Sequence, residues 1–322
     1  MFRNTANSVA AYVKNSYNEL VSLRAFFLLS GVLLVIANPS YAASTSASSS
    51  VAYDDEPGRA SLQVVNGPAG TAGSPSAASF TSSITPGLAS EGFGDVAFGA
   101  LHASAAAFSF GEFAQTRGAG GALWADQVTY TSSTLSGAAV ARASFSLSGG
   151  LSSTSDVNDV GAVGNSTIAG AVTVDGSQVF STTGQLVSRN GVMTTNDIKV
   201  NGVNVSGPSN SLTGVFFFDI PFVFNAPFQL RASLDAFVQA QTTAAGDQAS
   251  ATSSFGSSGL WGGISEVHRT DGTVLTDFSL TSDSGYDWSK AYTAPVPEPA
   301  SWALFTIALV GLAAVIRRRN TV

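Results

Sequence analysis

The chain has 322 residues, of which 44% are hydrophobic and only 11% are charged, so it can build a large core but must cover it mainly with uncharged polar groups. It contains no cysteine and two histidines, which excludes disulfides, cysteine nucleophiles and histidine-rich metal cages. The formal net charge of -7 argues against a nucleic-acid partner, because affinity for phosphate backbones comes from clustered lysine and arginine.

Residues 1–42 are predicted to be a signal peptide with a helical apolar core. A basic region precedes an uncharged run at 25–37, which matches an export signal and is too short to span a bilayer. Small residues place the cleavage site after Ala42, with Ala43 as the alternative. Signal peptidase and the Sec export machinery are therefore expected partners. The alternative is an uncleaved N-terminal anchor.

Residues 43–52 are rich in serine and are predicted to be a flexible linker, and residues 53–292 are predicted to form the folded body. The body carries 8 basic and 19 acidic residues, so it is more acidic than the whole chain. Most of its acids are isolated aspartates, which favours a soluble, cation-attracting surface over an organised active site.

Asn-Gly and Asp-Gly pairs between alternating sequences predict β-hairpins in the body, because these residues tolerate the positive φ angles of a type I′ turn. The pairs are Asp175-Gly176, Asn190-Gly191, Asn201-Gly202 and Asp271-Gly272. So many turn signals within about a hundred residues favour antiparallel β structure.

Several runs read as strands. Residues 228–240 alternate apolar and other side chains with a period of two, and 277–281 do the same. Residues 215–220 (VFFFDI) are predicted to be a strand buried on both faces and closed by Pro221. Residues 100–107 suit a short helix by propensity, but the sequence that follows them favours a strand.

These signals predict an all-β fold, an antiparallel β-sandwich or a jelly-roll-like body. One domain is preferred, with two small sandwiches as the alternative. Two glycine-rich segments, 92–97 and 118–121, are interpreted as a turn and a loop. The first matches G-x-G-x-x-A but lacks the surrounding strand and helix of a dinucleotide site.

The body shows little catalytic chemistry. His102 and His268 are expected to be structural or surface residues. Acid pairs such as Glu266 with Asp277 suit glycoside hydrolysis only if the fold brings them to within about 5 to 9.5 Å. No cofactor is expected, and the only metal considered is Ca²⁺.

The best ligand candidates are Asp283, Asp287 and Trp288, which share a turn with two carboxylates and an aromatic ring able to hold Ca²⁺ or a sugar. The acidic cluster at 54–56 is a second candidate for Ca²⁺, with a solvated segment as the alternative. Trp124 and Trp261 can stack on sugars, although aromatic side chains more often fill a core.

The C-terminal end has three consecutive parts. They are an extended linker at 293–299 that carries Pro297, Glu298 and Pro299, an uncharged apolar segment at 300–316, and a tail at 317–322 that begins with Arg317, Arg318 and Arg319. The apolar segment is predicted to be a single transmembrane helix near the lower length limit. The arginines should halt transfer and keep the tail in the cytoplasm.

This arrangement resembles the PEP-CTERM sorting signal of Gram-negative bacteria. The resemblance implies recognition of Pro297, Glu298 and Pro299 by an exosortase, a membrane protease-transpeptidase. It also implies an inner-membrane-anchored precursor whose tail is removed, so that the body reaches the cell surface or extracellular matrix. A permanent single-span anchor is the alternative.

We therefore expect an exported, non-enzymatic protein with a structural or adhesive role and exopolysaccharide as a partner. The first alternative is a carbohydrate-binding, lectin-like module. The second is an extracellular glycoside or ester hydrolase.

Overall fold

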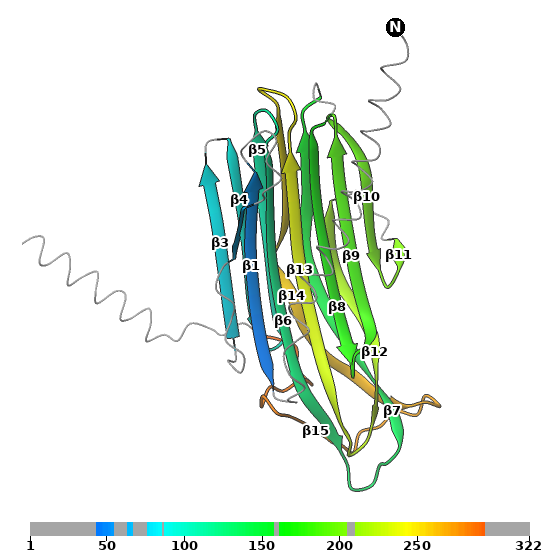
Figure 1. Ribbon diagram of the computed structural model, residues 1–322. Coiled ribbons are helices and arrows are strands. Elements are labelled where there is room, and N and C mark those ends of the chain that lie inside the picture. The colour runs from blue at the N-terminus through cyan, green and yellow to red at the C-terminus, as the bar shows by residue number, and fades with distance from the viewer. Residues whose placement is uncertain are drawn as a thin grey trace, which may run out of the picture. The chain divides into compact units, whose positions relative to one another are not determined.

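A computed structural model describes residues 43–54, 63–66, 76–85, 87–157, 161–204 and 210–293. These residues form β-strands and no helix, as the sequence predicts (Figure 1). The strands are β1 Ser44–Asp54, β2 Gln63–Asn66, β3 Ser76–Thr85, β4 Leu88–Ala97, β5 Ala100–Phe110, β6 Gln115–Thr131, β7 Ala138–Ser155, β8 Val163–Val174, β9 Ser177–Arg189, β10 Val192–Val200, β11 Val203–Asn204, β12 Ser211–Val223, β13 Pro227–Gln241, β14 Gln248–Arg269 and β15 Ser279–Ser282.

The predicted signal peptide, cleavage site, sorting motif, apolar segment and arginine cluster lie outside the described residues. Within those residues, no helix is long and apolar enough to cross a bilayer.

Every strand pairing is antiparallel, and the strands form two sheets. The nine-stranded sheet has the order β11-β10-β9-β8-β13-β6-β1-β2, with β15 also paired to β6. The six-stranded sheet has the order β12-β7-β14-β5-β4-β3. The inward side chains of both sheets belong to one hydrophobic core, so the sheets pack face to face as a sandwich.

Three of the four predicted hairpin turns have the backbone of a type I′ turn. Asp175-Gly176, Asn190-Gly191 and Asn201-Gly202 have positive φ at both positions and join β8 to β9, β9 to β10 and β10 to β11. At Asp271-Gly272 only the glycine has positive φ. Two backbone bonds close this longer turn, Gly272 N to Arg269 O (2.9 Å) and Arg269 N to Thr273 O (2.9 Å).

The alternation predicted for 228–240 is confirmed in β13, where all the apolar members from Phe228 to Ala240 are buried. The strand preference at 100–107 is likewise confirmed by β5. The prediction for 215–220 is wrong in part. This stretch lies in β12, an edge strand, where Val215 and Phe217 are exposed on the outer face.

Pro221 does not end β12, which continues to Val223. A proline lacks the N–H needed for pairing, so it is tolerated in a sheet mainly on an edge strand. The run of phenylalanines suggests burial on both faces, but its side chains alternate between the core and the outer face of the sheet.

The two glycine-rich segments are strand interiors and not a turn and a loop. Gly92 and Gly94 lie in β4, and Gly118 and Gly120 lie in β6 of the opposite sheet. A Cβ at Gly120 would stand 2.0 Å from the Phe93 carbonyl oxygen, and one at Gly92 would stand 1.9 Å from the Ala119 oxygen. Glycine is needed here because the two backbones approach each other directly.

The predicted flexible linker at 43–52 is also wrong, because Ser44–Asp54 form β1 between β6 and β2. Thr45, Ala47 and Val51 are buried on its inner side. These small side chains fit the narrow part of the core, where a Cβ at Gly94 would already meet the Ser48 oxygen at 2.8 Å. Tertiary packing thus overrides the low strand propensity of serine and alanine.

The opposite part of the core is filled by large aromatic rings, including all three described tryptophans. Tyr130 stacks on Phe222 with ring centroids 3.9 Å apart, and Phe218 lies 5.4 Å from Phe180. The core therefore changes from glycine and alanine near β4 to aromatic residues near β15, where the C-terminal residues pack.

Candidate functional site

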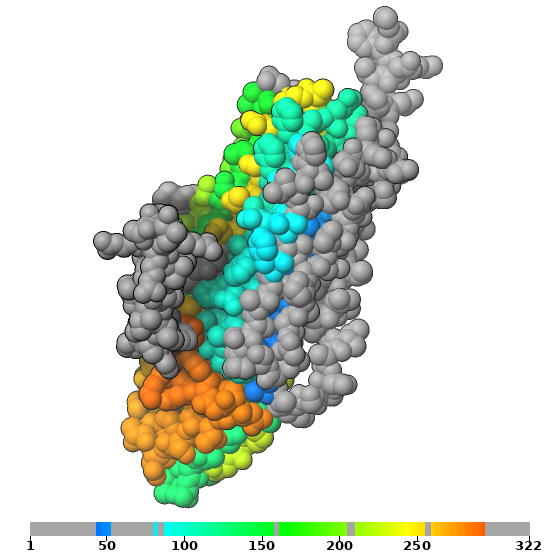
Figure 2. Space-filling model, turned by 90° about the vertical axis from the view of Figure 1, so that its left-hand side faces the viewer, coloured from blue at the N-terminus to red at the C-terminus, as the bar shows by residue number. Residues whose placement is uncertain are grey.

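The last described residues, Ser279–Thr293, fold back onto the sandwich, and we call this segment the C-terminal clasp. It begins with β15, which pairs with the end of β6 from Thr131 to Val128. In Figure 2 the orange residues of β14 and the clasp lie together on one part of the surface. The clasp is the part of the described chain closest in sequence to the predicted sorting motif, so its attachment determines where that motif is joined to the body.

Trp288 anchors the clasp through a buried polar contact. Its side chain is 0% exposed, and its Nε1 donates to Oδ2 of Asp126 at 2.7 Å. Asp126 is itself 1% exposed on β6. Ser284 donates from its backbone nitrogen to Oδ1 at 3.1 Å and from its hydroxyl to Oδ2. A buried carboxylate needs such partners, and here the clasp supplies all three.

Trp288 also completes an aromatic cluster. Its ring lies 4.4 Å from Trp124, 5.4 Å from Trp261 and 4.6 Å from Tyr286 between centroids. The carbonyl oxygen of Trp288 accepts a hydrogen bond from Nε1 of Trp261 at 2.8 Å. The clasp therefore contributes a central ring to the core.

Backbone contacts hold the end of the clasp against β14. Tyr292 N donates to the Trp261 oxygen at 2.8 Å, and Ile264 N donates to the Ser289 oxygen at 3.2 Å. Gly263 leaves the space for this chain, since a Cβ there would lie 2.8 Å from the nitrogen of Ala291. Attachment thus continues to Tyr292, immediately before the predicted linker.

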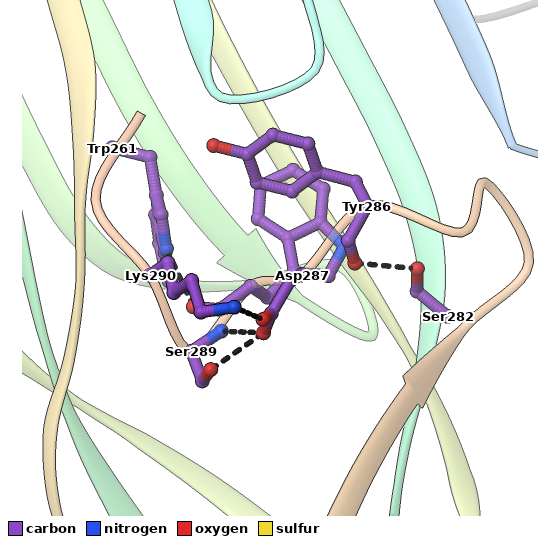
Figure 3. A network of polar contacts seen from close by, with 7 residues as sticks. Trp261, Ser282, Tyr286, Asp287, Ser289 and Lys290 are labelled. Carbon is purple, nitrogen blue, oxygen red and sulfur yellow. Dashed lines mark hydrogen bonds and ion pairs between the residues drawn. The ribbon is translucent and has the colours of Figure 1, made fainter. Parts of the chain in front are cut away.

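Asp287, Ser289 and Lys290 are exposed, and their side chains stabilise the turn of the clasp (Figure 3). Asp287 accepts from the Ser289 backbone nitrogen and hydroxyl and pairs with Lys290 Nζ at 2.8 Å. Ser282 donates its hydroxyl to the Tyr286 oxygen at 2.9 Å. These groups satisfy one another within the turn.

Two pKa shifts follow from these surroundings. The hydrogen bonds from Lys290 and Ser289 lower the pKa of Asp287 below its usual value. Burial raises the pKa of Tyr286 to about 12, and the nearby Tyr292 and Asp287 act in the same direction. The first shift extends the pH range of the ionised Asp287 toward acid, and the second extends the range of the protonated Tyr286 toward alkali.

The predicted ligand residues Asp283, Asp287 and Trp288 share the clasp but point to different places. Trp288 lies in the core, so its ring offers no face to a sugar in this structure. Asp287 is exposed and occupied by Ser289 and Lys290, while Asp283 is exposed and its backbone nitrogen donates to Gln127 O at 3.0 Å. Across the described ranges, no group of three or more histidine, aspartate and glutamate side chains is placed to hold a metal ion.

The other candidates make contacts of their own. His102 lies on β5 opposite Asp95, whereas His268 lies on β14 with Nδ1 3.0 Å from the Arg269 oxygen. Glu266 is opposite Arg142 in the six-stranded sheet, while Asp277 accepts from the Thr134 hydroxyl.

Trp124 and Trp261 are buried. In the acidic cluster at 54–56, Asp54 ends β1, and the other two residues lie outside the described part of the chain.

Sequence reasoning missed Asp126 and Ser284. The signal that could have identified Asp126 is its phase in β6, where it occupies an inward position between Trp124 and Val128, both buried. An acid in the inward phase of an apolar strand requires buried donors. The identity of those donors could not be read from the sequence, because they come from the other end of the body.

A second surface feature lies on the outer face of the six-stranded sheet. It is a shallow depression of about 380 Å³ where β7, β14 and the start of β12 adjoin. Its outward side chains are mostly hydroxyls, and the lining residues are Gly150, Leu151, Ser152, Asn210, Ser211, Thr252 and Ser254. This composition offers hydrogen bonds and no charge.

The comparisons with known proteins identify the C-terminal signal. Residues 295–319 match the PEP-CTERM protein-sorting motif, which confirms the resemblance read from Pro297, Glu298 and Pro299. The motif implies export, a membrane-anchored precursor and an exosortase as the processing partner. No curated protein and no solved structure matches this chain.

Proposed function

We propose that this chain is the precursor of a non-enzymatic structural or adhesive protein of the cell surface or extracellular matrix, released or attached there when an exosortase removes its apolar tail. The match of residues 295–319 to the sorting motif, directly after a folded body, carries this proposal. In this proposal the body is the mature protein, and the C-terminal end is the sorting signal that is removed from it.

The clasp supports the proposal because it separates the body from the sorting motif. Five residues after Tyr292, the last residue hydrogen-bonded to β14, the chain reaches Pro297, which limits their separation to about 18 Å. A cut at the motif leaves Trp288 and its partners in the product. The body can therefore lose its tail without losing any of its core.

A non-enzymatic role is supported by the way the body uses its polar groups. The buried carboxylate, Asp126, has both oxygens occupied by Trp288 and Ser284. Asp287, an exposed acid of the clasp, is paired with Lys290. These groups serve to hold the clasp in place.

The decisive experiment compares the chain with the double variant Pro297→Ala, Glu298→Ala in the producing cells. We expect the parent to be found at the surface or in the matrix with its tail removed, as intact-mass measurement would show. The double variant should keep its tail and remain in the membrane fraction. Pro295→Ala, which preserves the Pro-Glu-Pro triplet, is the matched control, and identical processing of all three would contradict the proposal.

The second candidate function is carbohydrate binding, and the hydroxyl-lined depression favours it. Ser152, Thr252 and Ser254 present exposed hydroxyls there, and the exposed Phe108 lies on β5, the strand next to β14, opposite Ser250. An apolar ring beside hydrogen-bonding groups is the usual composition of a sugar site. A glycan array tests this function. The double variant Thr252→Val, Ser254→Ala should abolish binding to any glycan that the parent binds. The control Ser46→Ala, on the other sheet, should leave that binding unchanged.

A further inference from the structure

Strand β12 is one of the two edge strands of the six-stranded sheet, and β3 is the other. Strand β12 is 13 residues long, and among the described strands it pairs only with β7. Its other side therefore presents a row of backbone N–H and C=O groups that can pair with an additional strand.

The side chains of β12 give this edge exposed apolar surface and little charge. Val215 and Phe217 are 58% and 54% exposed on the outer face, and Phe216, which points to the core, is only partly buried. Natural edge strands are commonly protected by lysine or by inward charges. Asp219 is the one charged residue of β12, and it lies on the outer face opposite Arg142.

We propose that β12 pairs with β12 of a second copy of this chain, antiparallel and centred on Phe216. The strand starts at Ser211, and Pro221, which lacks an N–H, limits pairing at the other end. The midpoint of these two limits is residue 216. An antiparallel arrangement about that point pairs residues 212–220 with themselves and leaves the proline outside.

This register matches side chains by kind. Val215 lies opposite Phe217 of the partner subunit, and Leu212 lies opposite Ile220 of the partner subunit. Thr213 lies opposite Asp219 of the partner subunit. Cross-strand apolar pairs and hydroxyl–carboxylate pairs are favourable, whereas a parallel in-register pairing would set Asp219 against its own copy. Charge thus favours the antiparallel direction.

The inference deepens the proposed structural role, on which it rests. A single strand pair buries little area, so it is effective only where copies are concentrated, as on a surface or in a matrix. Joining two six-stranded sheets edge to edge would form one continuous sheet and link neighbouring molecules.

The absence of cysteine from the chain allows a direct test with the full-length protein in the producing cells. The variant Val215→Cys with Phe217→Cys places each thiol opposite the other position of the partner. Mild oxidation with copper phenanthroline should then give a band of twice the monomer mass on a non-reducing gel. Both residues are exposed, so the fold should tolerate the changes.

The matched control is Phe108→Cys with Phe110→Cys. These residues have the same spacing and are exposed on the same sheet, but β5 lies between β14 and β4 and has no free edge. The control should stay monomeric. Equal cross-linking of the two variants, or no dimer from the β12 variant, overturns the inference.

A charge test checks the register. In the β12 cysteine variant, Thr213→Lys should raise the dimer yield because it faces the partner's Asp219, and Thr213→Asp should lower it. Equal yields from the two would reject the register. If the β12 variant stays monomeric while tail removal still requires Pro297 and Glu298, edge pairing fails and the proposed function stands.

Discussion

The indole nitrogen of Trp288 and the carboxylate of Asp126 form a buried hydrogen bond of 2.7 Å between positions 162 residues apart. This contact joins the C-terminal clasp to β6, an interior strand of the nine-stranded sheet. It makes the segment next to the sorting motif a part of the core, so the body should retain its full stability after the tail is removed.

The value of this bond can be isolated by comparing two tryptophans. Trp288→Phe removes a donor to a buried carboxylate, which should lower the free energy of unfolding by about 1–3 kcal/mol more than Trp124→Phe does. Trp124 is an apt control because it is equally buried and its Nε1 has no hydrogen-bond acceptor among the described residues. Urea denaturation followed by circular dichroism measures both. Equal losses would show that only ring volume matters.

The second prediction concerns the close approach of the two sheets. Gly120→Ala should destabilise the protein by about 3 kcal/mol or more, because its Cβ would meet the backbone oxygens of Phe93 and Ser104 at 2.0 and 2.5 Å. Gly150→Ala, also within a strand, would meet its nearest atom at 3.2 Å and should cost less than about 1 kcal/mol. Thermal unfolding compares them, and similar costs would contradict the backbone-contact explanation.

Much of the fold could be predicted from local pattern, and the failures share a physical cause. The alternation in β13 and the turns at Asn190-Gly191 and Asn201-Gly202 depend on local sequence, so they were predicted correctly. The glycines of β4 and β6 were misread because their role is visible only when the opposite sheet is in place. In the same way, the serines of β1 form a strand because the narrow core accepts small side chains.

The candidate site likewise has a part that local sequence predicts and a part that depends on distant residues. The Pro-Glu-Pro motif, the apolar segment and the arginines are contiguous, so the sorting signal could be recognised directly. Asp283, Asp287 and Trp288 also lie close together in the sequence, but Trp288 is buried whereas Asp283 and Asp287 are exposed. Which of them contacts Asp126 depends on the pairing of β15 with β6. These strands are far apart in the sequence, so no local pattern predicts their pairing.

The turn at Asn201-Gly202 gives a prediction that involves conformation alone. Gly202 has φ of 77°, and a Cβ built on it would meet no atom within 4 Å. Gly202→Ala should therefore cost about 1 kcal/mol through backbone strain without any clash. Gly202→Asn should cost less, because asparagine tolerates this conformation. Hydrogen exchange at the ends of β10 and β11 would report both, and a larger loss with asparagine would refute the explanation.

The raised pKa of Tyr286 predicts that the protein loses stability in alkali. The phenol ionises near pH 10 in the unfolded chain but near pH 12 in the folded protein, so above pH 10 the unfolded state binds fewer protons. The contribution is complete below pH 10 and is lost as the pH rises from about 10 to 12. Urea midpoints measured across this range should fall, and tyrosinate absorbance should rise together with unfolding.

Tyr286→Phe identifies the residue responsible for part of that fall. Phenylalanine keeps the ring contact with Trp288 but cannot ionise, so the variant's urea midpoint should decline less steeply between pH 10 and 12. Burial also raises the pKa of Tyr130, so a residual slope should remain in the variant. A slope unchanged by Tyr286→Phe would mean that the clasp does not sense alkaline pH. Loss of the whole slope would instead assign the effect to Tyr286 alone and exclude a contribution from Tyr130.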